Sequence, residues 1–124
     1  MIESAKVAMC HEFIEDLPNK YETIVGQHST SALSGGQIQR VCIARALCIQ
    51  PSILILDEGT SALDRSTEAS VITSLKNLAH ERGTIIISVT HRLETTKEAD
   101  AIFALELGEI AESGNYLELM NKKV

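Results

Sequence analysis

The chain has 124 residues, of which 44% are apolar, and this fits one small globular domain or part of a larger one and argues against disorder. Its net charge of −6 at pH 7, without a basic cluster, argues against a nucleic-acid-binding surface. The longest strongly apolar runs, Ile53 to Leu56 and Ile85 to Ile87, are far too short to cross a bilayer.

The first part of the chain is expected to form two helices separated by a loop. The expected elements are a helix over residues 2–14, an extended segment over 21–25, a polar loop over 26–31 and a helix from 34 to about 49. Leu17-Pro18-Asn19 ends the first helix, because proline cannot continue the helical hydrogen-bond pattern. Ser34 and Gln37 match the Ser-x-x-Gln capping box, in which each side chain satisfies an exposed backbone amide.

Two apolar segments in the second part are expected to be buried strands. Ile53 to Leu56 is continuously apolar, which suits a strand covered on both faces, and Thr84 to Val89 is rich in β-branched residues. Asp64 can cap the helix between them, and Gly83 can end it. The remaining elements are a short helix over 93–98, a hairpin of residues 101–105 and 109–112, and a last helix capped by Asn115. This alternation predicts an α/β layer with a parallel sheet, with the hairpin strands at its edge.

The three cysteines, Cys10, Cys42 and Cys48, are expected to be structural. Their number is odd, and they lack the paired spacing of a zinc site. We expect them to be small buried side chains in a reducing compartment, where disulfides are rare. The inferred setting is therefore cytosolic.

Side chains that suit phosphate chemistry follow both predicted strands. Asp57 and Glu58 come at the end of the first strand, and His91 follows the second. In open α/β sheets, ligands gather beyond the carboxyl ends of the strands. The pattern predicts that Asp57 holds Mg²⁺, Glu58 polarises an attacking water and His91 reaches the γ-phosphate. A plainer interpretation stays open, in which the acids cap a turn and the histidine is structural.

The segment Ser34-Gly35-Gly36-Gln37 also suits an anion. Glycines at a helix start let backbone N–H groups approach a phosphate closely, and the helix dipole favours negative charge there. The serine hydroxyl adds a donor. The same residues can serve simply as a helix cap, and both roles are compatible.

Four motifs in this order resemble those of the ABC-type ATPases. Leu33 to Gln37 reproduces the ABC signature, and Ile53 to Asp57 resembles the Walker B strand. Glu58 stands in the place of the catalytic glutamate. Ser61 to Asp64 resembles the D-loop, and His91 matches the switch histidine.

The resemblance extends from about Ile2 to Met120, and the segment Phe13 to Gly26 is similar to B-type exporters of drugs, lipids and peptides. It implies an α/β fold that is a partial P-loop NTPase-like layer, with parallel strands, flanking helices and the N-terminal half missing. Residues 1–50 would be the end of the helical subdomain with the signature helix. Residues 51–124 would carry the Walker B strand, the D-loop and the switch histidine. No Gly-x-x-x-x-Gly-Lys-Ser/Thr phosphate loop occurs in the 124 residues.

The resemblance also implies a head-to-tail dimer of cassettes, with ATP between the phosphate loop of one and the signature of the other. The site residues that it implies are Glu58 and His91 for catalysis, Asp57 for Mg²⁺, and Ser34, Gly35, Gly36, Gln37 and Asp64 for ATP. The acids and the histidine would serve the ATP of this cassette's own phosphate loop. The signature residues would contact an ATP held mainly by a partner.

The function implied by the resemblance is ATP hydrolysis coupled to export across a membrane. The expected partners are a second nucleotide-binding domain and a transmembrane domain, without nucleic acid. The chain is expected to be membrane-associated on the cytoplasmic side, through transmembrane segments of a longer protein of which it is a fragment. By itself it is expected to be inactive, because it lacks the phosphate loop. Two alternatives stay open: a truncated, non-catalytic chain that only donates a signature surface, and a soluble ABC ATPase.

Overall fold

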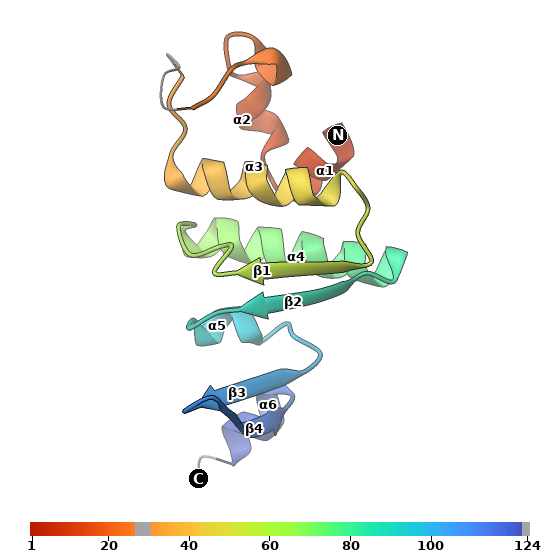
Figure 1. The fold of residues 1–124 in the computed structure, drawn as a ribbon, viewed down its shortest axis with the longest axis vertical. Helices are drawn as coiled ribbons and strands as arrows, with labels where there is room; N and C mark the ends of the chain where they lie inside the picture. Colours follow the sequence, from red (N-terminus) through yellow and green to blue (C-terminus); the bar gives the residue numbers. More distant parts are fainter. Residues whose placement is uncertain (27–30, 123–124) are drawn as a thin grey trace. The chain divides into compact units, whose positions relative to one another are not determined.

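A computed structural model describes residues 1–26 and 31–122, and it separates into two compact units, Met1–Val89 and Thr90–Val124 (Figure 1). The elements of the first unit are helices α1 (Ile2–Val7) and α2 (His11–Glu15), the 3₁₀ turn η1 (Lys20–Glu22), helix α3 (Gly35–Leu47), strand β1 (Ile53–Asp57), helix α4 (Arg65–Arg82) and strand β2 (Ile85–Val89). Most of the polar loop expected at 26–31 lies outside the described residues. No helix of the described part is long and apolar enough to span a membrane.

The helix expected over residues 2–14 is broken into α1 and α2, so that prediction was wrong in one respect. Met9 adopts a left-handed conformation with φ of 55°. The Met9 amide donates to the Lys6 carbonyl at 3.0 Å and the Cys10 amide to the Ala5 carbonyl at 2.8 Å, as in a Schellman helix end. Arg40 fixes this end from α3, because its Nη1 donates to the Met9 carbonyl at 2.6 Å. The break depends on a residue far along the chain, which helical periodicity does not reveal.

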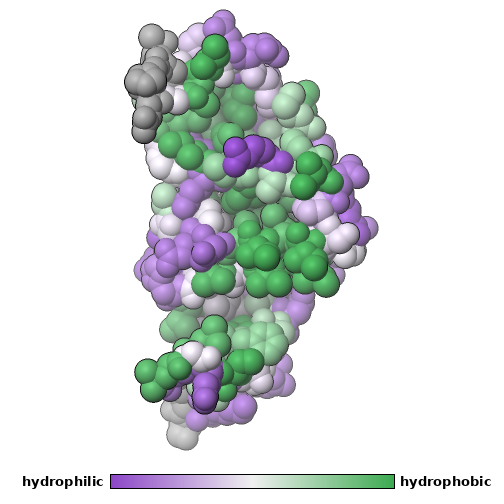
Figure 2. Space-filling model, in the orientation of Figure 1, coloured by the Kyte–Doolittle hydropathy of each residue, from purple (hydrophilic) through white to green (hydrophobic). Residues whose placement is uncertain are grey.

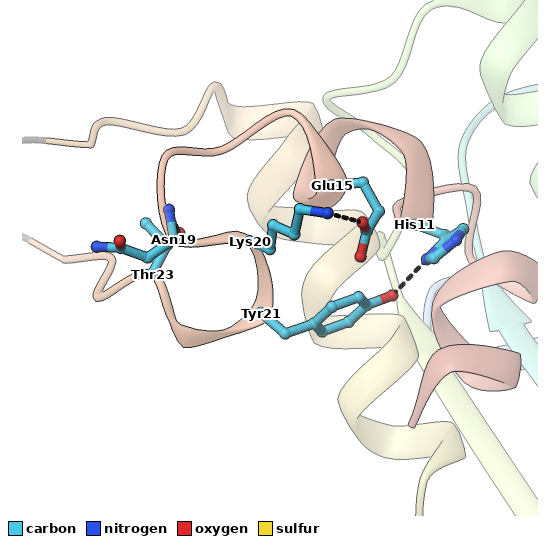
Figure 3. A network of polar contacts seen from close by, with 6 residues as sticks. All are labelled: His11, Glu15, Asn19, Lys20, Tyr21 and Thr23. Carbon is cyan, nitrogen blue, oxygen red and sulfur yellow. Dashed lines mark hydrogen bonds and ion pairs between the residues drawn. The ribbon is translucent and has the colours of Figure 1, made fainter.

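The segment after α2 first turns, which corrects the beginning of the extended segment expected at 21–25. Lys20 has a left-handed φ of 48° and, with Tyr21 and Glu22, forms the 3₁₀ turn η1. Figure 3 shows how side chains fix it: Lys20 Nζ pairs with Glu15 at 2.9 Å, and Tyr21 Oη lies 2.7 Å from His11 Nδ1. The chain is extended only from Thr23 onward.

The helix caps predicted from the sequence are confirmed. At α3, Ser34 Oγ accepts from the Gln37 amide at 3.2 Å, and Gln37 Oε1 accepts from the Ser34 amide at 2.9 Å. At α4, Asp64 Oδ1 accepts from the Thr67 amide at 3.0 Å, and Gly83 ends the helix with a left-handed φ of 68°. Both are local arrangements that a few consecutive residues determine.

Strands β1 and β2 form a parallel two-stranded sheet in the register Ile53↔Ile85 to Asp57↔Val89, as expected for an α/β layer. One face packs on the helices of the unit, α4 among them (Figure 1). The core of the unit consists of Ala5, Ala8, Cys10, Ile14, Ile43, Ala44, Leu47, Leu54, Leu56, Leu63, Val71, Leu75 and Leu78.

The other face of the sheet is exposed in the described chain, so the prediction that the strand over Ile53 to Leu56 is covered on both faces was wrong, and so was the prediction that the strand over Thr84 to Val89 is buried. Leu54 and Leu56 are buried, but the exposed fraction is 54% for Ile53 and 64% for Ile55. Ile85, Ile87 and Val89 are likewise exposed on β2. Figure 2 shows apolar side chains gathered over the two strands. Successive side chains of a strand point to opposite faces, and an apolar run does not tell which faces are covered.

The second unit contains α5 (Leu93–Thr96), β3 (Ile102–Glu106), β4 (Glu109–Gly114) and α6 (Tyr116–Asn121). The predicted hairpin and the last helix, capped by Asn115, are confirmed. The hairpin strands form a sheet of their own rather than the edge of the parallel sheet, which corrects that expectation. None of residues 90–122 is fully buried.

The cysteines differ from one another in exposure. Cys10 is buried, as predicted, but Cys42 and Cys48 are exposed on α3 and at its end. Burial raises the pKa of the Cys10 thiol from 9.0 to about 11. Cys10 therefore acts as a small apolar side chain of the core.

Candidate functional site

The acidic pair lies at the carboxyl end of the parallel sheet. Asp57 is the last residue of β1 and pairs with Val89, the last residue of β2. Glu58 follows, and its amide donates to the Val89 carbonyl at 3.0 Å. Both acidic residues are exposed, and Asp57 continues the exposed side of β1 in the alternation of that strand. The pair is thus held at the position where open α/β sheets bind ligands.

Glu58 has an unusual backbone conformation. Its φ of 47° lies in the left-handed region, which costs a non-glycine residue roughly 1–2 kcal/mol. The conformation directs the chain into a tight turn, in which the Glu58 carbonyl accepts a hydrogen bond from the Ser61 amide at 3.0 Å. Strained backbone of this kind is concentrated at functional sites, because the surrounding contacts must hold it in place.

The helix start at Ser34 has the geometry of an anion site. The first helical hydrogen bond runs from the Ile38 amide to the Ser34 carbonyl at 2.9 Å, so the amides of Gly35 and Gly36 precede it. The capping box uses the Ser34 oxygen as an acceptor, which leaves its hydroxyl hydrogen able to donate. Ser34 and Gly35 are exposed. The cap and the anion site predicted from the sequence are therefore compatible in one structure.

The structure gives the two glycines a second role, which sequence reasoning missed. A Cβ atom on Gly36 would lie 3.0 Å from the Ala62 carbonyl oxygen and 3.1 Å from Leu63 Cδ2. A Cβ on Gly35 would lie 3.5 Å from Ala62 Cβ. The glycines therefore allow α3 to start directly against the turn that follows Glu58.

Asp64 acts as the N-cap of α4. Its Oδ2 accepts from Thr67 Oγ1 at 2.6 Å, in addition to the bond from the Thr67 amide. These hydrogen bonds lower the pKa of the Asp64 carboxyl below its usual value. The bond from the Thr67 side chain has the largest effect, followed by the bond from the Thr67 amide. Its predicted contact with ATP stays a prediction beside this capping role.

His91 belongs to the second unit and is exposed. The chain reaches it two residues after Val89, the end of β2. Within the second unit, the neighbouring Thr90 Oγ1 accepts from the Arg92 amide at 3.0 Å and contacts Thr95 Oγ1 at 3.2 Å. The part of His91 in catalysis stays a prediction.

Further side chains hold the turn, and none of them had a role predicted from the sequence. Thr60 Oγ1 donates to Glu68 Oε1 at 2.6 Å, and both residues are buried. Gln39 of α3 binds the same turn from the other side, with its Nε2 3.0 Å from Ser61 Oγ. A buried carboxylate is costly unless a hydrogen bond satisfies it. An acidic residue on the otherwise apolar side of a helix, such as Glu68, was therefore the one sign in the sequence that a hydrogen-bond donor must lie close to it.

The described residues fit a magnesium nucleotide. They contain no group of three or more His, Cys, Asp or Glu side chains able to hold a metal alone. Mg²⁺ commonly takes one or two protein carboxylates and completes its shell with water and substrate phosphates. Asp57, exposed at the strand end, suits that coordination. The helix start at Ser34 suits a phosphate oxygen.

Comparison with known proteins connects this geometry to a family. A family model described as ABC transporter matches residues 3–61. The chain is 53% identical over 123 residues to ABC transporter B family member 4 of Dictyostelium discoideum, covering 99% of this chain and 16% of that relative. It is 50% identical to Multidrug resistance protein 3 of Entamoeba histolytica, covering 99% of this chain and 9% of that protein.

A solved structure shares the fold. It is described as the structure of a bacterial Atm1-family ABC exporter with ATP bound, and it superposes with a TM-score of 0.86 at 41% identity. The match covers 99% of this chain and 21% of that one. The chain therefore spans less than a quarter of the length of these similar proteins. It belongs to the ABC transporter family, and its α/β fold is that of a short part of the ATPase of an ABC exporter.

Proposed function

We propose that this chain is part of the ATPase of an ABC exporter and takes part in ATP hydrolysis coupled to export of a substrate. The identity of about half to exporter-type relatives over nearly the whole chain supports this function. In this proposal the chain works at the cytoplasmic side of a membrane. A transmembrane domain and a second nucleotide-binding domain, which forms a head-to-tail dimer with it, are its partners.

In the proposed mechanism, the residues at the sheet end act on bound ATP. Asp57 binds Mg²⁺, which neutralises phosphate charge. Glu58 orients and polarises the attacking water, and His91 contacts the γ-phosphate. Their exposure leaves them accessible to a nucleotide.

The signature residues act on a different nucleotide in this proposal. Ser34, Gly35, Gly36 and Gln37 donate hydrogen bonds to ATP held mainly by the second cassette, and Asp64 lies close to the same interface. The geometry that supports this role is the capped helix start, where Ser34 and Gly35 are exposed at the end of the helix at which the dipole favours negative charge.

The observation that carries the proposal is the parallel register of β1 and β2. It places Asp57 opposite Val89 and joins the Glu58 amide to the Val89 carbonyl. The acidic pair therefore lies beside Val89, and His91 follows Val89 by two residues in the sequence. This is the arrangement of polar groups beyond strand ends that phosphoryl transfer uses.

Replacing Glu58 tests the proposal in the longer protein that contains this chain. Glu58→Gln keeps the size of the side chain but removes the carboxylate, so we expect ATP turnover to fall at least about 100-fold with ATP binding retained. Glu81→Gln is the matched control, because Glu81 is exposed on α4, away from the strand end. Wild-type turnover in Glu58→Gln would remove Glu58 from its proposed role.

A second candidate function is a non-catalytic chain that only donates a signature surface to a complete cassette. The absence of a phosphate loop from the 124 residues favours it for the chain by itself. Titration calorimetry of the purified chain with Mg-ATP tests the premise that both candidate functions share. Micromolar affinity would contradict the expectation that ATP needs the phosphate loop of a longer protein.

A further inference from the structure

The side chain of Gln39 joins α3 to the turn that begins at Glu58. Its Nε2 donates hydrogen bonds to the Glu58 carbonyl oxygen at 3.2 Å and to Ser61 Oγ at 3.0 Å. Its Oε1 accepts a hydrogen bond from the Ala62 amide at 2.8 Å. A glutamine amide has two N–H donors and one carbonyl oxygen, and each takes part. A single side chain thus spans the turn from Glu58 to Ala62.

This contact acts on the strained residue of the turn. The left-handed backbone of Glu58 persists only where neighbouring groups fix it. Its amide is held by the Val89 carbonyl, and its carbonyl is held by the Ser61 amide and by Gln39. Of these three partners, Gln39 is the one that comes from α3. Its loss would remove the hydrogen bond that joins the Glu58 carbonyl to α3.

The start of α3 approaches the same turn through its glycines. Gly35 and Gly36 precede Gln39 by four and three residues, so all three lie on one side of the helix. Gly36 lies so close to Ala62 that an added Cβ would be 3.0 Å from the Ala62 carbonyl oxygen. The helix start and the turn therefore form a tightly packed joint, which Gln39 closes with hydrogen bonds.

We propose that Gln39 is a positioning residue for Glu58, and that through it the helix start at Ser34 and the Glu58 carboxylate move together. Gln39 acts on the reaction through the Glu58 backbone and not through the nucleotide. The catalytic half of this inference rests on the proposed function, in which Glu58 polarises the water. The signature contacts the second cassette's ATP, so Gln39 links that ATP to the orientation of Glu58 at this cassette's own site.

The experiment uses the longer, ATP-hydrolysing protein that contains this chain, with the variant Gln39→Glu. A glutamate keeps an acceptor for the Ala62 amide but loses both donors, so it releases the Glu58 carbonyl, which can only accept. We expect kcat to fall about 10- to 100-fold, because a small displacement of a catalytic group has an effect of that size. The KM for ATP should change less than about two-fold, because no ATP contact is removed. Cys42→Ala, an exposed change on the same helix, should keep wild-type kinetics.

Combining Gln39→Glu with Glu58→Gln separates positioning from a general loss of structure. If Gln39 acts through Glu58, the double variant turns over ATP no more slowly than Glu58→Gln alone. An equal fold-loss in both backgrounds, or an unchanged kcat in Gln39→Glu, would overturn the proposal. Ser61→Ala removes one acceptor of the Gln39 amide and should give a smaller loss of the same kind, which keeps the test valid if Gln39→Glu does not fold.

Hydrogen exchange distinguishes failure of this inference from failure of the proposed function. In Gln39→Glu the Glu58 and Ser61 amides should exchange at least about ten-fold faster than in the wild type, with no such change in Cys42→Ala. Unchanged amide exchange in Gln39→Glu would show that Gln39 does not hold the turn, whatever the ATPase activity of the variant. The amides can also exchange faster in Gln39→Glu while Glu58→Gln keeps wild-type ATP turnover. That pair of results would support the contact between Gln39 and the turn and would refute the catalytic role of Glu58.

Discussion

Replacing Gly36 by alanine measures how closely α3 approaches the turn after Glu58. The new Cβ would lie 3.0 Å from the Ala62 carbonyl oxygen and 3.1 Å from Leu63 Cδ2, closer than ordinary van der Waals contact. Overpacking of this kind costs roughly 1–3 kcal/mol. Alanine in place of glycine in a helix contributes up to about 1 kcal/mol in the opposite direction. We therefore expect Gly36→Ala to be destabilised by about 0–2 kcal/mol.

Gly35→Ala is the matched comparison, because it makes the same chemical change one residue earlier in the helix. Its Cβ would lie 3.5 Å from Ala62 Cβ, an ordinary contact. This variant should gain the helical preference of alanine without overpacking, so we expect it to be as stable as the wild type or up to about 1 kcal/mol more stable. The difference in unfolding free energy between the two variants should be about 1–3 kcal/mol.

Urea unfolding followed by circular dichroism gives this difference from the two midpoints, provided that the slopes agree. A second measurement is hydrogen exchange at Ala62 and Leu63, which should become faster in Gly36→Ala only. Equal stability of the two variants would refute the reasoning, because it would show that the helix start has room for a methyl group. The close approach that supports the role of Gln39 would then be wrong as well.

Three further predictions concern the rest of the fold. Arg40→Met should lower the free energy of unfolding by about 1.5 kcal/mol, because the charged hydrogen bond to the Met9 carbonyl at 2.6 Å is lost. The midpoint of urea unfolding measures this change. An unchanged midpoint would show that the break between α1 and α2 does not need the Arg40 hydrogen bond. Since the pKa of Cys10 is raised from 9.0 to about 11, the unfolded state loses the thiol proton first, and stability should fall by at most about 3 kcal/mol between pH 9 and 11. Cys10→Ala should remove that part of the pH dependence, and an identical pH profile in the variant would contradict the assignment. Leu107→Asn should stabilise the hairpin by about 0.5–1 kcal/mol, measured as a higher unfolding temperature, because Leu107 is 100% exposed in a left-handed turn position with φ of 52° that asparagine tolerates better.

Local features of the fold could be predicted because a few adjacent residues determine them. The caps at Ser34, Asp64 and Asn115 follow from side chains that bond amides within three residues. The parallel pairing of β1 and β2 follows from two apolar segments that flank an amphipathic helix. The same two segments predict from the sequence that Asp57 and Glu58 lie at a strand end.

Features that depend on distant residues could not be predicted. At the break after α1, Arg40 binds the Met9 carbonyl, and the Glu58 backbone is bound by Gln39 and Val89. The sequence shows that these residues exist but not which of them meet. For the same reason the glycines of the helix start were interpreted as anion contacts or as part of a helix cap, although Ala62 lies against Gly36.

The one-sided parallel sheet determines how the chain behaves in solution. Both strands of a two-stranded sheet are edge strands, and on β1 and β2 a row of isoleucines faces water. Such a surface favours self-association and the binding of hydrophobic dyes. We expect light scattering to increase with protein concentration, and dye fluorescence to decrease when Ile55 and Ile87 are both replaced by threonine. Threonine keeps the β-branched shape that strands prefer while exposing a hydroxyl to water.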